Sequence, residues 1–135
     1  MIKKITHFSF AIIMVLMLIS CKNTKQKLQE YVTTYNSTAA SFKAENVTLT
    51  TARGYINDNK IELRFETNLE QNASNKLKAT TSFSKLLKEM INKDQIPAAL
   101  VKEGVQFDTY FLADDNTVLS KEIISNQTIS ELMKE

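Results

Sequence analysis

The residue types available for chemistry in this chain are carboxylates, lysines, two arginines, tyrosines, serines and threonines. The one histidine, His7, lies within the first 20 residues beside a long apolar run, and the chain has one cysteine and no tryptophan. Without His7, a Ser-His-Asp or Cys-His site cannot be assembled, and zinc sites built on His and Cys ligands are excluded. We therefore expect no catalytic residues, no metal site and no cofactor in the folded domain.

Two carboxylates, Glu62 and Glu66, are the candidates for an acid/base pair. They alternate with Leu63 and Phe65, so they share one face of a predicted strand. At a rise of roughly 3.3 Å per residue they stand about 13 Å apart, whereas a glycosidase pair needs roughly 5–9.5 Å. With Arg64 between them, we interpret these residues as a solvated, mutually screened row.

Asp114, Asp115 and Asn116 could form a fragment of a calcium-binding loop. A complete loop places ligands at alternating positions, with a Gly in the middle and a bidentate Glu, and these are missing here. The three residues lie between two alternating apolar runs, where Asp and Asn favour a turn. We predict a hairpin turn and no metal site.

Tyr31, Tyr35 and Tyr55 are candidates for a binding groove lined by aromatic rings. Tyr31 and Tyr35 are four residues apart, which is the spacing of neighbours on one helix face. Aromatic residues at this spacing more often belong to a core. The groove and the core interpretations make opposite predictions about exposure to solvent.

The side-chain charges balance once the N-terminal segment is removed. The chain has 17 basic and 15 acidic residues, and Lys3 and Lys4 are the only charged side chains before Cys21, which leaves 15 of each. Nucleic-acid-binding proteins normally show a strong basic excess. We therefore expect no nucleic-acid partner.

The first 21 residues have the order of an export signal followed by a lipid-attachment site. Lys3 and Lys4 precede an almost wholly apolar run from Phe8 to Ile19. This run is shorter than the roughly 20 residues that span a bilayer and has the length of a signal-peptide h-region. It ends in Leu18-Ile19-Ser20-Cys21, which resembles the lipobox of bacterial lipoproteins.

This resemblance implies that residues 1–20 are cleaved, that Cys21 is the lipid attachment site for acyl chains such as palmitate, and that residues 21–27 are a lipid-anchored tether on the extracytoplasmic side of the membrane. Two or three acyl chains, at about 0.8 kcal/mol per buried CH₂, would hold the protein stably. Lys22 differs from the Asp that resembles an inner-membrane retention signal in some Gram-negative bacteria. The outer membrane is therefore expected if the host has two membranes.

Hydrophobic periodicity predicts one domain over residues 28–135. Steps of three and four residues indicate helices at about 25–42, 77–92 and 95–103, and a short helix is predicted at 126–134. Alternating residues indicate one hairpin with its turn at 57–59 and a second with its turn at 114–116, and the polar, Asn-rich residues 68–75 are predicted to form a loop. We expect Asp94 to cap the third helix, Gly104 to follow it, and Gly54 to mark a bulge.

The order helix, hairpin, helix, hairpin, short helix predicts the α+β class. Its simplest closure is a four-stranded antiparallel sheet from two β-hairpins, with helices packed on one face. The stretch Gly104-Val105-x-Phe107 leading into 114–116 resembles small lipoprotein domains of uncharacterised function with this element order. That resemblance implies no site residue.

The anchor, the neutral charge and the missing catalytic residue types favour a non-catalytic binding module of the cell envelope. Its partners would be the membrane, through the lipid, and an envelope protein. One alternative is a cell-wall hydrolase that uses carboxylates alone, which requires a deep cleft with two carboxyls at working distance. The other is a carrier of an apolar ligand, which requires an unfilled space between sheet and helix.

The chain also contains four N-x-S/T triplets. In a bacterial lipoprotein no glycan is expected at them, so we interpret them as chance occurrences in an Asn- and Thr-rich chain. They begin at Asn36, Asn46, Asn72 and Asn126.

Overall fold

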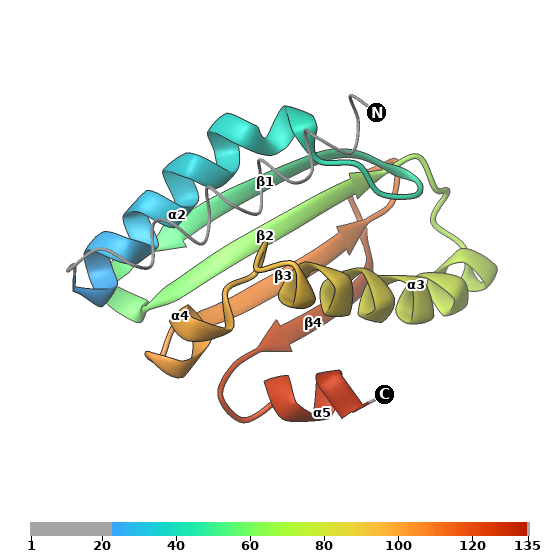
Figure 1. Cartoon of the computed structure of the whole chain (residues 1–135). Helices are drawn as coiled ribbons and strands as arrows, with labels where there is room; N and C mark the ends of the chain where they lie inside the picture. The colour runs from blue at the N-terminus through green and yellow to red at the C-terminus, as the bar shows by residue number, and fades with distance from the viewer. Residues whose placement is uncertain (1–22, 135) are drawn as a thin grey trace.

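A computed structural model describes residues 23–134, which form helices and one four-stranded sheet (Figure 1). This confirms the α+β class. The elements are α2 (Thr24–Thr38), the 3-10 turn η1 (Ala39–Ser41), β1 (Val47–Tyr55), the 3-10 turn η2 (Ile56–Asp58), β2 (Lys60–Thr67), α3 (Ala73–Asn92), α4 (Ala98–Lys102), β3 (Gln106–Leu112), β4 (Val118–Ile124) and α5 (Ile129–Lys134).

The sheet has the order β1-β2-β3-β4, with two antiparallel hairpins joined at a parallel centre. Lys60 of β2 is in register with Gln106 of β3, and Glu66 with Leu112. The prediction of a purely antiparallel sheet is therefore wrong at β2–β3. The reason is the connection over residues 68–105, which contains α3 and α4 and returns the chain to the starting end of β2 before β3 begins.

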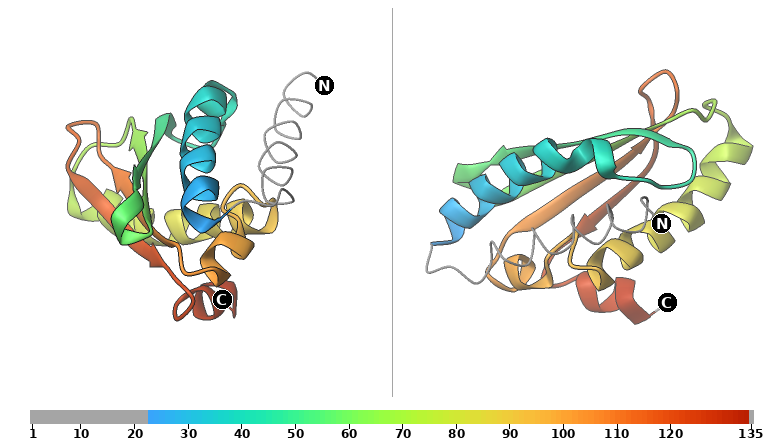
Figure 2. Two further views of the ribbon diagram at one scale, coloured as in Figure 1. Left: turned by 90° about the vertical axis from the view of Figure 1, so that its left-hand side faces the viewer. Right: turned by 45° about the horizontal axis from the view of Figure 1, so that its top comes forward.

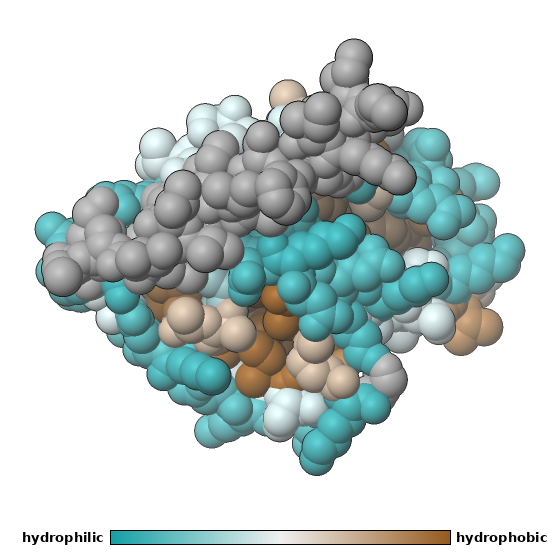
Figure 3. Space-filling model, viewed as in Figure 1, coloured by the Kyte–Doolittle hydropathy of each residue, from teal (hydrophilic) through white to brown (hydrophobic). Residues whose placement is uncertain are grey.

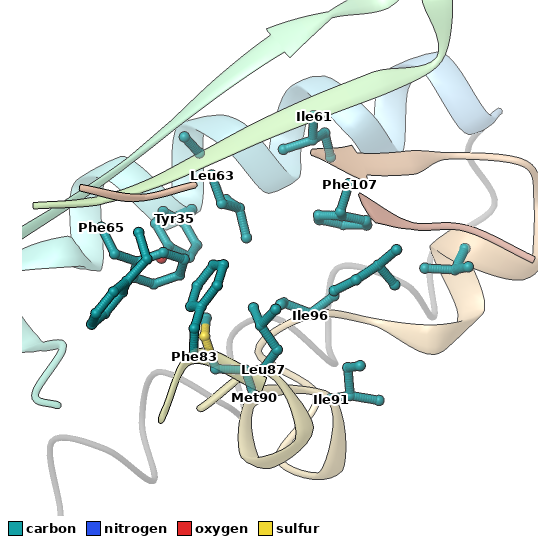
Figure 4. Packing of buried hydrophobic residues seen from close by; sticks show 14 of the residues in the cluster. Tyr35, Ile61, Leu63, Phe65, Phe83, Leu87, Met90, Ile91, Ile96 and Phe107 are labelled. Carbon is teal, nitrogen blue, oxygen red and sulfur yellow. The ribbon is translucent and has the colours of Figure 1, made fainter. Parts of the chain in front are cut away.

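The helices and the sheet enclose one core (Figure 4). Ile61, Leu63 and Phe65 point from β2 into it, and Phe83 of α3 packs against Phe65 and Phe111 with ring centroids 5.7 and 5.1 Å away. Buried hydrophobic side chains from both the sheet and the helices of residues 23–134 form this core. The apolar-carrier alternative, which requires an unfilled core, therefore gains no support.

The helices pack on the side of the sheet that carries these apolar residues, as seen from the end of the sheet (Figure 2). α2 lies along β1, and α3 crosses to β4. Hydrophilic side chains cover the outer surface of α3 (Figure 3). Each of these two helices thus buries one apolar stripe against the sheet, as its amphipathic pattern predicted.

The first helix begins earlier than the predicted tether allows. Asn23 caps α2: its side chain accepts a hydrogen bond from the Gln26 backbone N–H, and the Gln26 side chain accepts one from the Asn23 N–H. This reciprocal pair is a capping box. Residues 24–27, assigned from the sequence to a tether, are therefore the first turn of α2.

Gly54 does not form the predicted bulge. It is in regular register with Ile61, and the shift in the β1–β2 ladder lies between Val47 and Leu49. A Cβ atom at Gly54 would lie 3.0 Å from Leu28 Cδ2 and 3.2 Å from Val32 Cγ2. The missing side chain therefore lets α2 approach β1 closely.

The starting points of α3 and α4 both depart from their predictions. α3 begins at Ala73 with Asn72 as its N-cap, inside the predicted loop. Asp94 has a φ of 58° and does not cap the next helix, since α4 starts only at Ala98 after Pro97. Gly104 follows the C-cap of α4 with a φ of 100°, which confirms its predicted C′ role.

The C-terminal helix is shorter than predicted. α5 covers Ile129–Lys134, whereas the sequence predicted 126–134. Ser125 closes a turn before it, because its carbonyl accepts hydrogen bonds from the backbone N–H groups of Thr128 and Ile129. α5 then adds Ile129 and Leu132 to the margin of the core.

Candidate functional site

The sheet face opposite the core is the most distinctive surface of the described residues. Because side chains alternate along a strand, each strand that sends apolar residues to the core sends its other residues to this side. We call it the open face. It is formed by Leu49, Thr51, Arg53 and Tyr55 of β1, Lys60, Glu62, Arg64 and Glu66 of β2, Gln106, Asp108, Tyr110 and Leu112 of β3, and Val118, Lys121 and Ile123 of β4.

The register arranges these side chains in rows across the strands. Arg53 lies opposite Glu62, which lies opposite Asp108. In the next row Arg64 lies opposite Tyr110 of β3. Arg53 and Glu62 therefore place opposite charges across β1 and β2, which favours this strand pair.

Two tyrosine rings on the open face are flanked by cations. Lys60 Nζ lies 4.8 Å from the ring centroid of Tyr55, and the Arg53 guanidinium carbon lies 5.4 Å from the same centroid. Lys121 Nζ lies 5.1 Å from the ring centroid of Tyr110. Both rings are therefore held in place by neighbours that are themselves surface residues.

The carboxylate of Asp108 organises the centre of the open face. Its Oδ1 accepts a hydrogen bond from Gln106 Nε2 at 2.7 Å, and its Oδ2 lies 3.7 Å from Lys60 Nζ. Asp108 is 7% exposed, so its contacts lie largely out of solvent. The charges of the whole face nearly balance: Arg53, Lys60, Arg64 and Lys121 against Glu62, Glu66 and Asp108.

Apolar side chains border this polar centre. Within residues 23–134, five large hydrophobic side chains are exposed, and three of them, Leu49, Val118 and Ile123, belong to the open face. Their exposed fractions are 52%, 43% and 40%. Aromatic residues and Arg at the centre with exposed apolar residues nearby are typical of protein–protein interfaces.

The edges of the sheet are less available than its face. On β1, the side-chain amide of Asn36 hydrogen-bonds both the N–H and the carbonyl of Ala52, at 2.8 and 2.9 Å. On β4, the Thr128 hydroxyl donates to the Ile123 carbonyl at 2.7 Å. Occupied backbone groups obstruct the addition of a further strand.

The candidate acid/base pair, Glu62 and Glu66, lies on the open face of β2 as the alternation predicted. Arg53 stands opposite Glu62 across the strands, and the Tyr55 hydroxyl lies 3.5 Å from a carboxylate oxygen of Glu62. A shallow hollow of about 400 Å³ is lined by both glutamates together with Thr51, Arg53 and Arg64. The two glutamates thus belong to a row of charged surface side chains, and this arrangement gives no support to a carboxylate-only hydrolase.

Tyr31 and Tyr35 do not line a groove, so that interpretation is wrong for them. Tyr31 is 2% exposed and Tyr35 fully buried. The Tyr31 hydroxyl donates to the Gln95 carbonyl at 2.7 Å, and the Tyr35 hydroxyl lies 2.6 Å from Thr50 Oγ1. Burial raises the pKa of both phenols above the ordinary value of 10.0. Both residues belong to the core, and only Tyr55 reaches a candidate binding surface.

The Tyr35 hydrogen bond has a defined direction. Thr50 Oγ1 donates its proton to the Arg64 carbonyl at 3.0 Å, so it can only accept from Tyr35. The chain Tyr35–Thr50–Arg64 thus links α2, β1 and β2. Helix and hairpin are tied by a polar contact as well as by packing.

Asp114, Asp115 and Asn116 form the predicted hairpin turn. The Ala113 N–H bonds the Thr117 carbonyl at 2.8 Å, and an Asp115 carboxylate oxygen accepts from the Thr117 hydroxyl at 2.6 Å. Hydrogen bonds donated by the Thr117 hydroxyl and by the Thr117 N–H lower the pKa of the Asp115 carboxyl. Within residues 23–134, no group of His, Cys, Asp or Glu is arranged to hold a metal ion.

Three of the N-x-S/T asparagines have structural roles that the sequence did not predict. Asn36 holds the edge of β1, Asn72 caps α3, and Asn46 has a φ of 64° at the turn before β1. Asn tolerates this left-handed conformation better than most residues. Hydrogen bonding or backbone conformation thus explains these three asparagines.

Cys21, the predicted lipid attachment site, and Lys22 lie outside the described residues, as do residues 1–20 and His7. Within residues 23–134, no helix combines the length and apolar composition of a membrane span.

Comparison with known proteins gave no match to a family model, a curated protein or a solved structure.

Proposed function

We propose that this chain is a lipid-anchored bacterial envelope lipoprotein that acts as a non-catalytic binding module, and that the open face docks an envelope protein. The lipobox-like Leu18–Cys21 supports the anchor. The observation that carries the docking role is the gathering of exposed Leu49, Val118 and Ile123 around a centre with Tyr and Arg side chains.

The chemistry of the open face favours a folded protein as the partner. Its nearly balanced charges suit neither a nucleic acid nor another polyanion, which would need a cationic surface. A protein surface can supply both signs of charge opposite Arg53, Glu62 and Arg64, and apolar side chains opposite the border. Asn36 and Thr128 obstruct strand addition at the edges. The partner is therefore expected to contact the face.

The location follows from the anchor. With residues 1–20 removed and Cys21 acylated, the domain lies on the extracytoplasmic side of the membrane, and Lys22 favours the outer membrane in a host with two. Mass spectrometry of the protein from its native membranes should find an acylated N-terminal Cys21. An unmodified thiol, or an intact peptide bond between residues 20 and 21, would contradict the anchor.

Docking is tested by site-specific cross-linking in the native host. A photo-reactive amino acid replaces Thr51 on the open face, and the matched control replaces Thr81, an exposed threonine of α3. We expect a discrete cross-linked protein from position 51 only. The cross-link should be lost with Leu49→Glu and kept with Leu77→Glu, since Leu77 is an exposed leucine on α3. Equal products from both positions, or loss with both variants, would refute docking at the open face.

A further inference from the structure

The start of α2, the turn η2 and α4 lie together at one end of the domain. α2 contacts both η2 and α4, and all three lie at the same end of the sheet (Figure 1). Glu103, the C-cap of α4, accepts from Lys27 Nζ at 2.7 Å and from Thr24 Oγ1 at 3.0 Å. We call this the anchor end. Its parts are tied to the first turn of α2.

The chain between the expected lipid and this end is very short. Two residues, Lys22 and Asn23, separate Cys21 from Thr24, the first residue of α2. Three Cα–Cα steps of about 3.8 Å each limit the Cα atoms of Cys21 and Thr24 to about 11 Å apart. The capping box fixes Asn23 to the helix, so one residue of the sequence, Lys22, lies between Cys21 and the capped end of α2.

We propose that the anchor end rests against the lipid surface, so that the strands of the open face run away from the membrane. This inference rests on the proposed acylation of Cys21. The Cα atom of Cys21 lies within about 11 Å of that of Thr24. Its acyl chains therefore cannot stay in the bilayer while the far end of the sheet faces the membrane, because β2 alone spans eight residues, or roughly 26 Å.

This orientation orders the rows of the open face by height above the membrane. The row of Tyr55, Lys60 and Gln106 lies nearest the bilayer, because β1 ends and β2 and β3 begin there. The row of Leu49, Glu66 and Val118 lies farthest. The whole face lies within a few tens of ångströms of the lipid. The docked protein would therefore contact the open face from the side, close to the bilayer.

The test measures depth at single cysteines. Acylation uses Cys21, so an introduced cysteine is the only free thiol. Asn57→Cys in η2 and Lys102→Cys in α4 report on the anchor end, and Asp114→Cys in the β3–β4 turn reports on the far end; all three positions are exposed. The acylated full-length protein is labelled with a small fluorophore and placed in phosphatidylethanolamine–phosphatidylglycerol vesicles that contain headgroup-quencher lipid.

We expect quenching at positions 57 and 102 to exceed that at 114 by about twofold or more, as expected for short-range contact with lipid over a roughly 20 Å difference in height. Equal quenching at all three would overturn the orientation. It would leave the proposed function intact, since vesicle binding and the mass of the acylated N-terminus are measured on the same samples. Absence of the acyl mass would instead refute the anchor itself.

A linker variant separates tethering from other causes. About 20 Gly and Ser residues inserted between Lys22 and Asn23 add a root-mean-square reach of roughly 25 Å. We expect the difference between positions 57 and 114 to vanish in this variant while vesicle binding persists. A preserved difference would show that the short connection does not set the orientation, and would overturn the inference.

Discussion

The side-chain amide of Asn36 in α2 occupies both outward backbone groups of Ala52 in β1, as a neighbouring strand would. Its nitrogen donates to the Ala52 carbonyl at 2.9 Å, and its oxygen accepts from the Ala52 N–H at 2.8 Å. One residue thus attaches the first helix to the sheet and closes the middle of an edge strand. An amide is required, because the contact needs one donor and one acceptor on one planar group.

Asn36→Ala removes both hydrogen bonds and should lower the free energy of unfolding by about 1–2 kcal/mol. Asn36→Asp should be destabilising at neutral pH, because a carboxylate then faces the Ala52 carbonyl. It should regain stability as the pH falls and the new carboxyl group acquires a proton to donate. Urea unfolding between pH 3 and 7 measures both variants. Ser37→Ala, one residue on in the same helix, is the control, and an equal loss there would argue against the edge contact.

Gly54→Ala should destabilise the domain by roughly 1–3 kcal/mol, because the added methyl overpacks the contact between β1 and α2. Leu28 Cδ2 would lie 3.0 Å from the new Cβ. In a Leu28→Ala background the additional cost should therefore fall by at least about 0.5 kcal/mol. Denaturant unfolding of the four proteins of this cycle measures the coupling. Strict additivity would show that Leu28 does not cause the constraint.

Alkaline pH should unfold the domain through its two buried phenols. Burial raises the folded-state pKa of Tyr31 and Tyr35 above 10.0, while an unfolded chain titrates near that value. Their stabilisation is complete below pH 10 and is lost as the pH rises from 10 towards the folded-state pKa. Each phenol contributes up to about 1.4 kcal/mol per pH unit in that window.

Tyr35→Phe should remove one of these two contributions and so reduce the slope of stability against pH above 10. Chemical denaturation at a series of pH values measures it. Tyr55→Phe, the same substitution at a half-buried tyrosine of the open face, is the matched control for the loss of a hydroxyl group. An unchanged slope in Tyr35→Phe would contradict the assignment.

The Lys27–Glu103 pair should make a small, acid-sensitive contribution. The hydrogen bond from Lys27 lowers the pKa of the Glu103 carboxyl below 4.5, so the stabilisation is present above that value and is lost as the pH falls through the lower folded-state pKa. Because the Glu103 side chain is 34% exposed, we expect Glu103→Gln to cost at most about 1 kcal/mol at pH 7. The difference from the parent protein should shrink towards pH 3. A constant difference across this range would point to packing instead of charge.

Local structure was predictable where one physical signal dominates. Alternation of Ile61, Leu63 and Phe65 with charged residues predicted β2 and the face that each residue takes, and the Asp-Asp-Asn run predicted the turn at 114–116. Gly104 followed its helix as expected. These features depend on residues close together in the chain, so the sequence pattern contains the needed information.

Features that depend on distant residues were not predictable. The parallel register of Lys60 with Gln106 is set by how α3 and α4 return the chain, which periodicity does not encode. The close approach behind Gly54 depends on Leu28 and Val32, which lie on another element. The open face itself appears only when four strands are put in register, because its rows combine residues as far apart as Thr51 and Lys121.

The parallel seam between β2 and β3 also sets the order in which the native structure can assemble. Each hairpin closes through neighbours in the chain, as β1 and β2 do across η2, whereas Lys60 meets Gln106 only after a long loop has been closed. Loop-closure entropy makes such distant pairings slow relative to hairpins. The two hairpins are therefore expected to form before the parallel pairing of β2 with β3 joins them, so that the open face is completed last.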